Sequence, residues 1–171
     1  SSAASDVYKR QEYNGVSFTN GNIIYSNNAR TMPGYNLHSD YIAVPWTHQV
    51  FSFQFNWADY LMIDDRYVHH TRLHNKSIFL KITPHARLEI ILGLEHWVQW
   101  GGTSSRYGKQ PSSFKDYLRI VCGKAGGDGA TNSDIINALG NHLGREHLRI
   151  NYKGDNYLLS FYHDIPFEDG S

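Results

Sequence analysis

The segment at residues 50–57, VFSFQFNW, alternates strictly between apolar and polar side chains. This period of two indicates a β-strand, because successive side chains of a strand point to opposite faces of its sheet. Similar alternation recurs in SIFLKIT at 77–83, RLEIILGLEHWVQW at 87–100, HLRINYK at 147–153 and NYLLSFYH at 156–163. Weaker strands are predicted at 15–25 and 37–45. We therefore expect an all-β protein.

The predicted strands are joined by connections of two kinds. TPHA at 83–86 and KGDN at 153–156 have the residue types of tight turns, and residues 46–49 are a further candidate. Long connections are predicted at 26–36, 58–76 and 101–146. The last of these contains two helix candidates, PSSFKDYLRIV at 111–121 with Ser112 or Ser113 as the cap, and TNSDIINALG at 131–140.

Alternating strands with tight turns at one end and long loops at the other are typical of outer-membrane β-barrels. A soluble β-sandwich also has one apolar face, but the polar faces here also carry Ile91, Trp97 and Tyr162. These bulky residues suit a filled lumen better than a water-exposed face. We predict an antiparallel up-and-down transmembrane β-barrel segment of about six or seven strands, with short helices in one long loop.

Aromatic residues stand at both ends of the predicted apolar faces. Trp57 and Trp100 lie at the loop end of their strands, and Tyr152 and Tyr157 flank the KGDN turn. Rings at these positions predict the two aromatic girdles that a barrel places at the membrane surfaces. Outer-membrane lipid is accordingly an expected partner.

The stretch LEHWVQWGG at 94–102 tests this arrangement most sharply. Trp97 and Trp100 are three residues apart, so a strand places them on opposite faces. Trp97 is expected in the lumen and Trp100 in the girdle. His96 shares the lipid-facing side and is a misfit there, which requires the membrane interface or a bulge.

The amino-acid composition limits the classes of binding partner that are expected. Aromatic residues make up 14% of the chain, which favours strands and surfaces that face carbohydrate or a membrane interface. The formal net charge of zero gives no bulk attraction for nucleic acid, so none is expected as a partner. Cys122 is the only cysteine, so no disulfide framework is expected.

Several blocks of the chain resemble one family of bacterial surface proteins. GLEHWVQWGG, RYGKQPSSFKDYLRIV, GKAGGDGATNSDIINALGNHLG, LRINYKG and PFEDGS resemble the capsule assembly Wzi family as it occurs in Bacteroidetes-type bacteria. RYVHHTRLHNKSIFLKI is similar to the upstream hairpin of that family. The resemblance implies a non-enzymatic outer-membrane β-barrel lectin that retains capsular or extracellular polysaccharide at the cell surface.

The resemblance also bears on domain organisation. It covers most of residues 12–171, and the family's barrel is larger, so this region is expected to be a partial, internal barrel domain. Residues 1–11, SSAASDVYKRQ, back-translate in frame onto a transposase-type sequencing adapter, and we expect them not to be native sequence. A set of barrel strands with unpaired edges is not expected to fold stably alone in water.

The long loop carries the candidate polysaccharide contacts. Sugars stack on aromatic rings, and acidic sugars attract cationic side chains. The candidates are Arg106, Tyr107, Lys109, Lys115 and Arg119. In GKAGGDG at 123–129, Lys124 precedes Ala125 rather than Ser or Thr, so a phosphate-binding loop is not predicted.

Other chemistries have weaker signals. His70 and His74 would share a face only on a helix, and neither they nor His69 and His85 predict a metal site. No cofactor is expected either.

A glycosidase would need two neighbouring carboxylates. Glu89 and Glu95 share a strand face about 20 Å apart, too far for a catalytic carboxylate pair. Ion pairs with Lys81 or Arg149 inside the lumen are the expected role for these glutamates. Glu95 with Asp116 or Asp134 stays open as a pair. A porin or channel, or a soluble β-rich carbohydrate-active enzyme, are the alternative functions.

Overall fold

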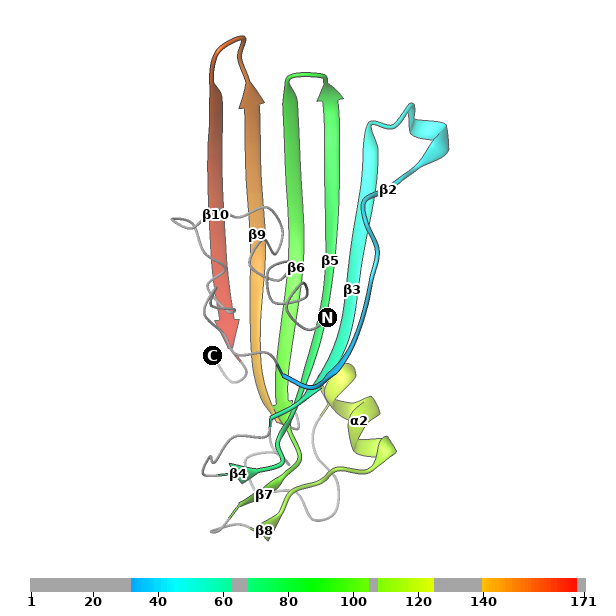
Figure 1. Cartoon of the computed structure of the whole chain (residues 1–171), viewed down its shortest axis with the longest axis vertical. Coiled ribbons are helices and arrows are strands. Elements are labelled where there is room, and N and C mark those ends of the chain that lie inside the picture. The colour runs from blue at the N-terminus through cyan, green and yellow to red at the C-terminus, as the bar shows by residue number, and fades with distance from the viewer. Residues whose placement is uncertain (1–31, 63–67, 105–107, 125–139, 169–171) are drawn as a thin grey trace, which may run out of the picture. The chain divides into compact units, whose positions relative to one another are not determined.

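The fold was analysed in a computed structural model, which describes residues 32–62, 68–104, 108–124 and 140–168. Apart from Met32, these residues belong to one compact unit, Pro33–Ser171. The main sheet is antiparallel and its strands follow one another in chain order (Figure 1). Its strands are β1 (Gly34–His38), β3 (Phe51–Leu61), β5 (Arg72–His85), β6 (Leu88–Trp100), β9 (Asn141–Lys153) and β10 (Leu158–Glu168). The predicted all-β, up-and-down class is confirmed.

The sheet is open within the described residues, with β1 and β10 as its two edges. The short β2 (Ile42–Ala43) pairs with the first half of β3. β2 lies within the weak strand predicted at 37–45 and β1 overlaps its first two residues, so two short strands take the place of the single predicted one. The strand predicted at 15–25 and the stretch 1–11 lie outside the described residues.

The central strands pair residue for residue over most of their length. One continuous row runs from Phe55 through Ile78, Leu94 and Glu146 to Ile165. The β5–β6 pair has a single register irregularity, between Ile82 and His85, beside its turn. Because a slip of one residue would exchange the faces, this register keeps the apolar side chains of neighbouring strands on one face.

The strands extend further at the loop end than the sequence pattern predicted. β3 continues to Leu61, β5 begins at Arg72 and β9 begins at Asn141, so the connections predicted at 58–76 and 101–146 were too long. The added residues include Asp59 and His74, which break the alternating pattern in sequence but pair across β3 and β5. The tight turn predicted at 153–156 is confirmed at 154–157, whereas the turn predicted at 83–86 lies at 86–87, because residues 83–85 belong to β5.

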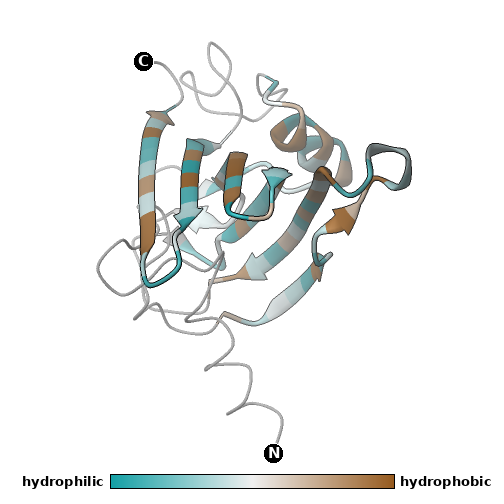
Figure 2. Cartoon of the chain, turned by 90° about the horizontal axis from the view of Figure 1, so that it is seen from above, coloured by the Kyte–Doolittle hydropathy of each residue, from teal (hydrophilic) through white to brown (hydrophobic). Residues whose placement is uncertain are grey.

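The two faces of the sheet are inverted relative to a sheet that is packed in water. We call the face with Phe55, Ile78 and Leu94 the apolar face, and the face with Ser77 and Glu95 the polar face. Ile78 and Leu94 are each 54% exposed, whereas Glu95 is 1% exposed. Figure 2 shows the hydropathy alternating along the strands. Exposed members of the apolar face include Phe51, Phe55, Ile78, Leu92, Leu94, Leu159, Phe161 and Ile165, and two polar residues, Glu146 and His163, are exposed among them.

A smaller sheet and a helix lie beyond the loop end of the main sheet (Figure 1). The small sheet consists of β4 (Val68–His69), β7 (Thr103–Ser104) and β8 (Gly108–Lys109). Helix α2 (Phe114–Val121) confirms the first helix prediction, and Ser113 is its N-cap in a capping box with Asp116. Residues 131–139 of the second predicted helix lie outside the described residues.

The turn predicted at 46–49 is also confirmed. It contains the short 3₁₀ helix η2 (Pro45–Thr47). His48 and Gln49 follow with positive φ angles of 50° and 64°, which reverse the chain between β2 and β3.

Candidate functional site

Arg145 on β9 is the centre of a buried charge cluster on the polar face. Its Nη2 donates to Glu95 Oε2 at 2.6 Å, and its Nη1 lies 3.5 Å from Asp164 Oδ1. His147 Nδ1 lies 2.6 Å from the same Asp164 oxygen. The cluster joins β6, β9 and β10, and a buried ion pair of this kind is costly to break from one side only.

The structural ion pair predicted for Glu95 is therefore confirmed, but its predicted partners were wrong. Arg145, fifty positions along the chain, takes the place expected for Lys81 or Arg149. Glu89 accepts a hydrogen bond from Asn151 Nδ2 at 2.8 Å. Lys81 lies over the ring of Tyr41, with Nζ 4.1 Å from the ring centroid.

Tyr41 therefore lies beside Lys81 in the turn half of the polar face, and its ring offers the Lys81 ammonium a cation–π contact.

Trp97 and Trp100 lie on opposite faces of β6, as predicted. Trp97 is buried on the polar face, where its Nε1 donates to Glu95 Oε1 at 2.8 Å. Its ring lies parallel to that of Tyr60 with centroids 6.4 Å apart. These bulky residues fill the polar face at its loop half.

Trp100 lies on the apolar face, but helix α2 covers it. Trp100 is 5% exposed and packs with Val98 and Ile120. Trp57, the other girdle candidate at this end, donates from Nε1 to the Tyr117 hydroxyl at 3.1 Å. At the turn end Tyr152 and Tyr157 are exposed, with ring centroids 6.3 Å apart.

Asp59 ties α2 to the edge of the sheet. Its Oδ2 accepts hydrogen bonds from Tyr35 at 2.6 Å and from Tyr117 at 2.9 Å, while Oδ1 lies 3.0 Å from His74 Nδ1. Burial raises the pKa of the Tyr117 hydroxyl, and its bond to Asp59 raises it further. The hydroxyl therefore remains a donor throughout the physiological pH range. No sequence pattern pointed to this cluster, because its members come from four separate elements.

His96 lies on the apolar face, as predicted. The register is regular at this position, so the β-bulge that was one of the two expected ways to accommodate His96 does not occur here. Its Nε2 lies 2.9 Å from His142 Nδ1. Beside it in the same row, the Lys76 ammonium donates to the Val121 carbonyl at the end of α2. His96 thus lies between the exposed apolar rows and the part of the apolar face on which α2 packs.

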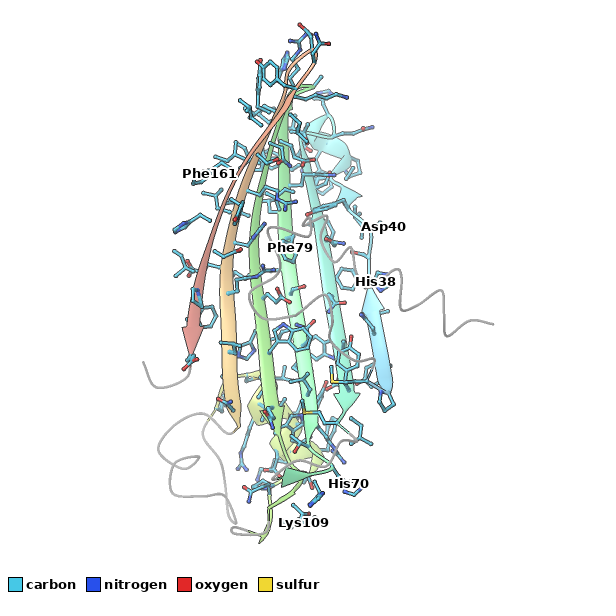
Figure 3. The ribbon with its side chains drawn as sticks, turned by 60° about the vertical axis from the view of Figure 1, so that its left-hand side comes forward. His38, Asp40, His70, Phe79, Lys109 and Phe161 are labelled. Atoms are coloured by element: carbon cyan, nitrogen blue, oxygen red, sulfur yellow. The ribbon has the colours of Figure 1, made fainter. Side chains whose placement is uncertain are left out.

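The predicted polysaccharide contacts fall on two elements. Lys109 is exposed on β8 at the loop end (Figure 3), and Lys115 is exposed on α2. Arg119 is partly buried on α2, with its Nη1 3.1 Å from Asp116 Oδ1. Arg106 and Tyr107 lie outside the described residues. The described candidates thus divide between the small sheet and the helix.

The residues of the alternative chemistries are also separated. His69 and His70 are exposed in and after β4, while His74 is buried against Asp59 and His85 closes β5. Within the described ranges no three His, Cys, Asp or Glu side chains are placed to hold a metal ion. Glu95 and Asp116 do not form the carboxylate pair that the sequence left open. Asp116 accepts a hydrogen bond from Ser113 at the start of α2, which packs on the apolar face, whereas Glu95 lies on the polar face. Asp134 lies outside the described residues.

The apolar face also has a groove of about 440 Å³. Ile78, Leu80, Leu92 and Leu94 line it from β5 and β6, with Leu148 from β9. None of the helices in the described part of the chain has the length and apolarity to cross a bilayer.

The fold and this arrangement of faces define an all-β antiparallel sheet with a buried ionic network and an exposed apolar face. Comparison with protein-family models, curated proteins and solved structures finds no match for the chain.

Proposed function

We propose that this chain forms part of the wall of an outer-membrane β-barrel of the capsule assembly Wzi type, which binds capsular or extracellular polysaccharide at the bacterial surface. One observation carries the proposal. The ionic cluster of Glu95, Arg145 and Asp164 is buried on one face, while Ile78 and Leu94 are exposed on the other. A barrel wall has this distribution, because its outer face contacts lipid and its inner face is polar.

The extent of the apolar face supports a membrane placement. From Leu88 to His96 along β6 the distance is about 26 Å at the rise of a strand. Barrel strands tilt by about 35–45°, so this length spans about 19–22 Å of the roughly 25 Å tall outward apolar band of a barrel. Tyr152 stands beside Leu88 at one limit of this band, and Trp57 lies in the row of His96 at the other. Outer-membrane lipid is the partner that this band fits.

The side chains of the polar face favour a lumen that is filled by side chains rather than an open channel. Phe79 and Trp97 are buried there beside the Arg145 cluster. Side chains of this size leave less room for an aqueous path than the charged, open lumen of a porin.

Polysaccharide is proposed as the ligand on two grounds. The sequence blocks from Ile78 onward resemble a lectin family, and Lys109 is an exposed cation at the loop end. Glu95, the carboxylate considered for a glycosidase pair, is buried and ion-paired with Arg145. The geometry favours binding over turnover.

The membrane placement can be tested with adjacent residues on one strand. Phe161 lies on the apolar face of β10 (Figure 3), and Ser160 is exposed on the polar face, where it bonds to Asn151. In a Cys122→Ser background, Phe161→Cys and Ser160→Cys are labelled with an environment-sensitive dye and reconstituted into phosphatidylcholine vesicles. We expect lipids brominated in their acyl chains to quench the dye at position 161 much more strongly than at 160.

Equal quenching at the two positions would contradict the barrel wall. A monomeric chain that is soluble without detergent and melts cooperatively would contradict it as well.

The ligand can be tested separately with alginate, an acidic polysaccharide, immobilised on a sensor. The chain in detergent micelles is expected to bind it, and Lys109→Gln is expected to weaken binding. Arg87→Gln, at the β5–β6 turn on the opposite end, is the matched control. Ion conductance by the vesicles without alginate binding would favour a channel, and turnover of the alginate would favour an enzyme.

A further inference from the structure

We infer that α2 is a membrane-interface helix, whose outward side sits among the anionic lipid headgroups around the barrel. This inference rests on the proposed function, because it takes the apolar face to contact lipid. It reassigns Lys115 and Arg119 from polysaccharide to lipid phosphate. The partner is thus the bilayer itself rather than the surface glycan.

The inward side of α2 fixes where the helix lies. Ile120 packs on Val98 and Trp100, and the Tyr117 ring lies 5.6 Å from that of Trp100. Val98 and Trp100 belong to the face of β6 that also exposes Leu92 and Leu94. The helix therefore lies on the lipid side of the wall and not in the lumen.

The ends of α2 set its depth relative to the exposed apolar rows. Arg72, opposite Trp100 at the loop end, donates to the Ser112 carbonyl at 3.4 Å just before the helix. Lys76 donates to the Val121 carbonyl at its last residue. Lys76 is two positions from Ile78, which is exposed in the apolar band, so the helix ends where the band begins. This is the depth of the headgroup region.

The outward side of α2 is divided into two flanks. Phe114 is 74% exposed and Leu118 is 49% exposed, and their spacing of four residues places them together on one flank. Lys115 and Arg119 have the same spacing and form the other flank, on which Lys115 is the exposed cation and Arg119 is paired with Asp116. An exposed apolar stripe beside a basic stripe is the pattern of helices that lie in a membrane interface.

Anionic lipid fits this surface better than polysaccharide does. The last residue of α2 lies beside Lys76, two positions from the exposed Ile78, so acyl chains that cover the apolar face would reach the end of the helix. The basic flank then meets the phosphates, to which basic side chains near a membrane surface are attracted. A glycan would stack on Phe114 and pair with Lys115 but would leave Leu118 in contact with water.

The test uses the whole chain in vesicles, with a dye on a single cysteine at Leu118 in the Cys122→Ser background. Vesicles contain phosphatidylcholine alone or with phosphatidylglycerol, and some lipids are brominated near the headgroup end of the acyl chain. We expect a blue shift and a loss of fluorescence at position 118, greater when phosphatidylglycerol is present. Lys115→Gln should reduce that dependence, and Arg87→Gln, at the β5–β6 turn, should leave it unchanged.

The dye at Phe161 separates failure of this inference from failure of the proposed function. Quenching at 161 without quenching at 118 overturns the interface helix and leaves the barrel wall standing. Absence of quenching at both positions overturns both. If alginate shifts the emission at 118 while phosphatidylglycerol does not, α2 is a polysaccharide contact and the inference fails.

Discussion

The ring of Phe79 covers Gly93 directly across the β5–β6 pair. A Cβ atom added to Gly93 would lie 2.3 Å from Cε1 of Phe79. The two residues are register partners on the polar face, and Phe79 is buried in the middle of the sheet (Figure 3). An aromatic ring that covers a glycine in the facing strand fixes register, because no other alignment offers the ring an empty position.

Gly93→Ala is therefore expected to destabilise the sheet by about 1–3 kcal/mol through overpacking. Urea unfolding in detergent micelles, followed by circular dichroism, measures the change. Phe79→Leu in the same chain removes the ring and should recover part of the loss. Additive effects of the two substitutions would show that the ring does not occupy the position of the missing Cβ.

Arg145→Met is expected to cost about 3–5 kcal/mol, because it leaves Glu95 and Asp164 buried without their shared guanidinium. The same unfolding experiment measures this. Adding Glu95→Gln to Arg145→Met should restore part of the stability. Arg87→Met is the matched control, since Arg87 pairs with Asp155 in an exposed bridge at a turn. Equal losses for the two arginine variants would contradict the role assigned to the buried cluster.

Ser113→Ala is expected to loosen α2 by about 1 kcal/mol, because the Ser113 hydroxyl accepts the Asp116 amide at the helix start. Hydrogen exchange of a peptide covering 113–122 should become faster. Ser112→Ala is the control, since its side chain is not the cap. Unchanged exchange in the Ser113 variant would mean that docking on Trp100 alone holds the helix.

Acid is expected to loosen α2 through Asp116. Burial alone would raise the pKa of this carboxyl, but hydrogen bonds from the Ser113 side chain and backbone and from Arg119 outweigh it and lower the pKa below its ordinary 3.8. The stability that the carboxylate contributes is complete above pH 3.8 and is lost as the pH falls through the lowered value.

A dye on Cys122, at the end of α2, can follow this transition between neutral and strongly acidic pH. Asp116→Asn should remove the part of the signal change that falls below the ordinary pKa. Asp155→Asn, at the exposed turn, should retain it. A signal change that is identical in all three chains would assign the acid response to other groups.

Local sequence signals were sufficient for the parts of the fold that local chemistry determines. Strict alternation predicted the middle of every long strand, and Ser112 or Ser113 after Pro111 predicted the start of α2. Glycine, aspartate and asparagine located the turn at 154–157, whereas Pro84 suggested a turn where β5 continues.

Contacts between distant segments could not be predicted in this way. The choice of Arg145 over Arg149 as the partner of Glu95 depends on the register of β6 and β9, since these arginines lie on the same face four residues apart. The burial of Trp100 depends on α2, which folds back onto the strand that precedes it. The extension of β3 and β5 required the pairing of Asp59 with His74, which no alternation rule contains.

The inversion of the two faces determines which substitutions each face can accumulate during evolution. Lipid is a liquid and has no fixed shape to match, so Ile78 or Leu94 can be exchanged for any side chain of similar apolarity. Arg145 can change only if Glu95 and Asp164 change with it. In the proposed barrel, substitutions should therefore accumulate singly on the outside of the wall and in concerted sets on the inside.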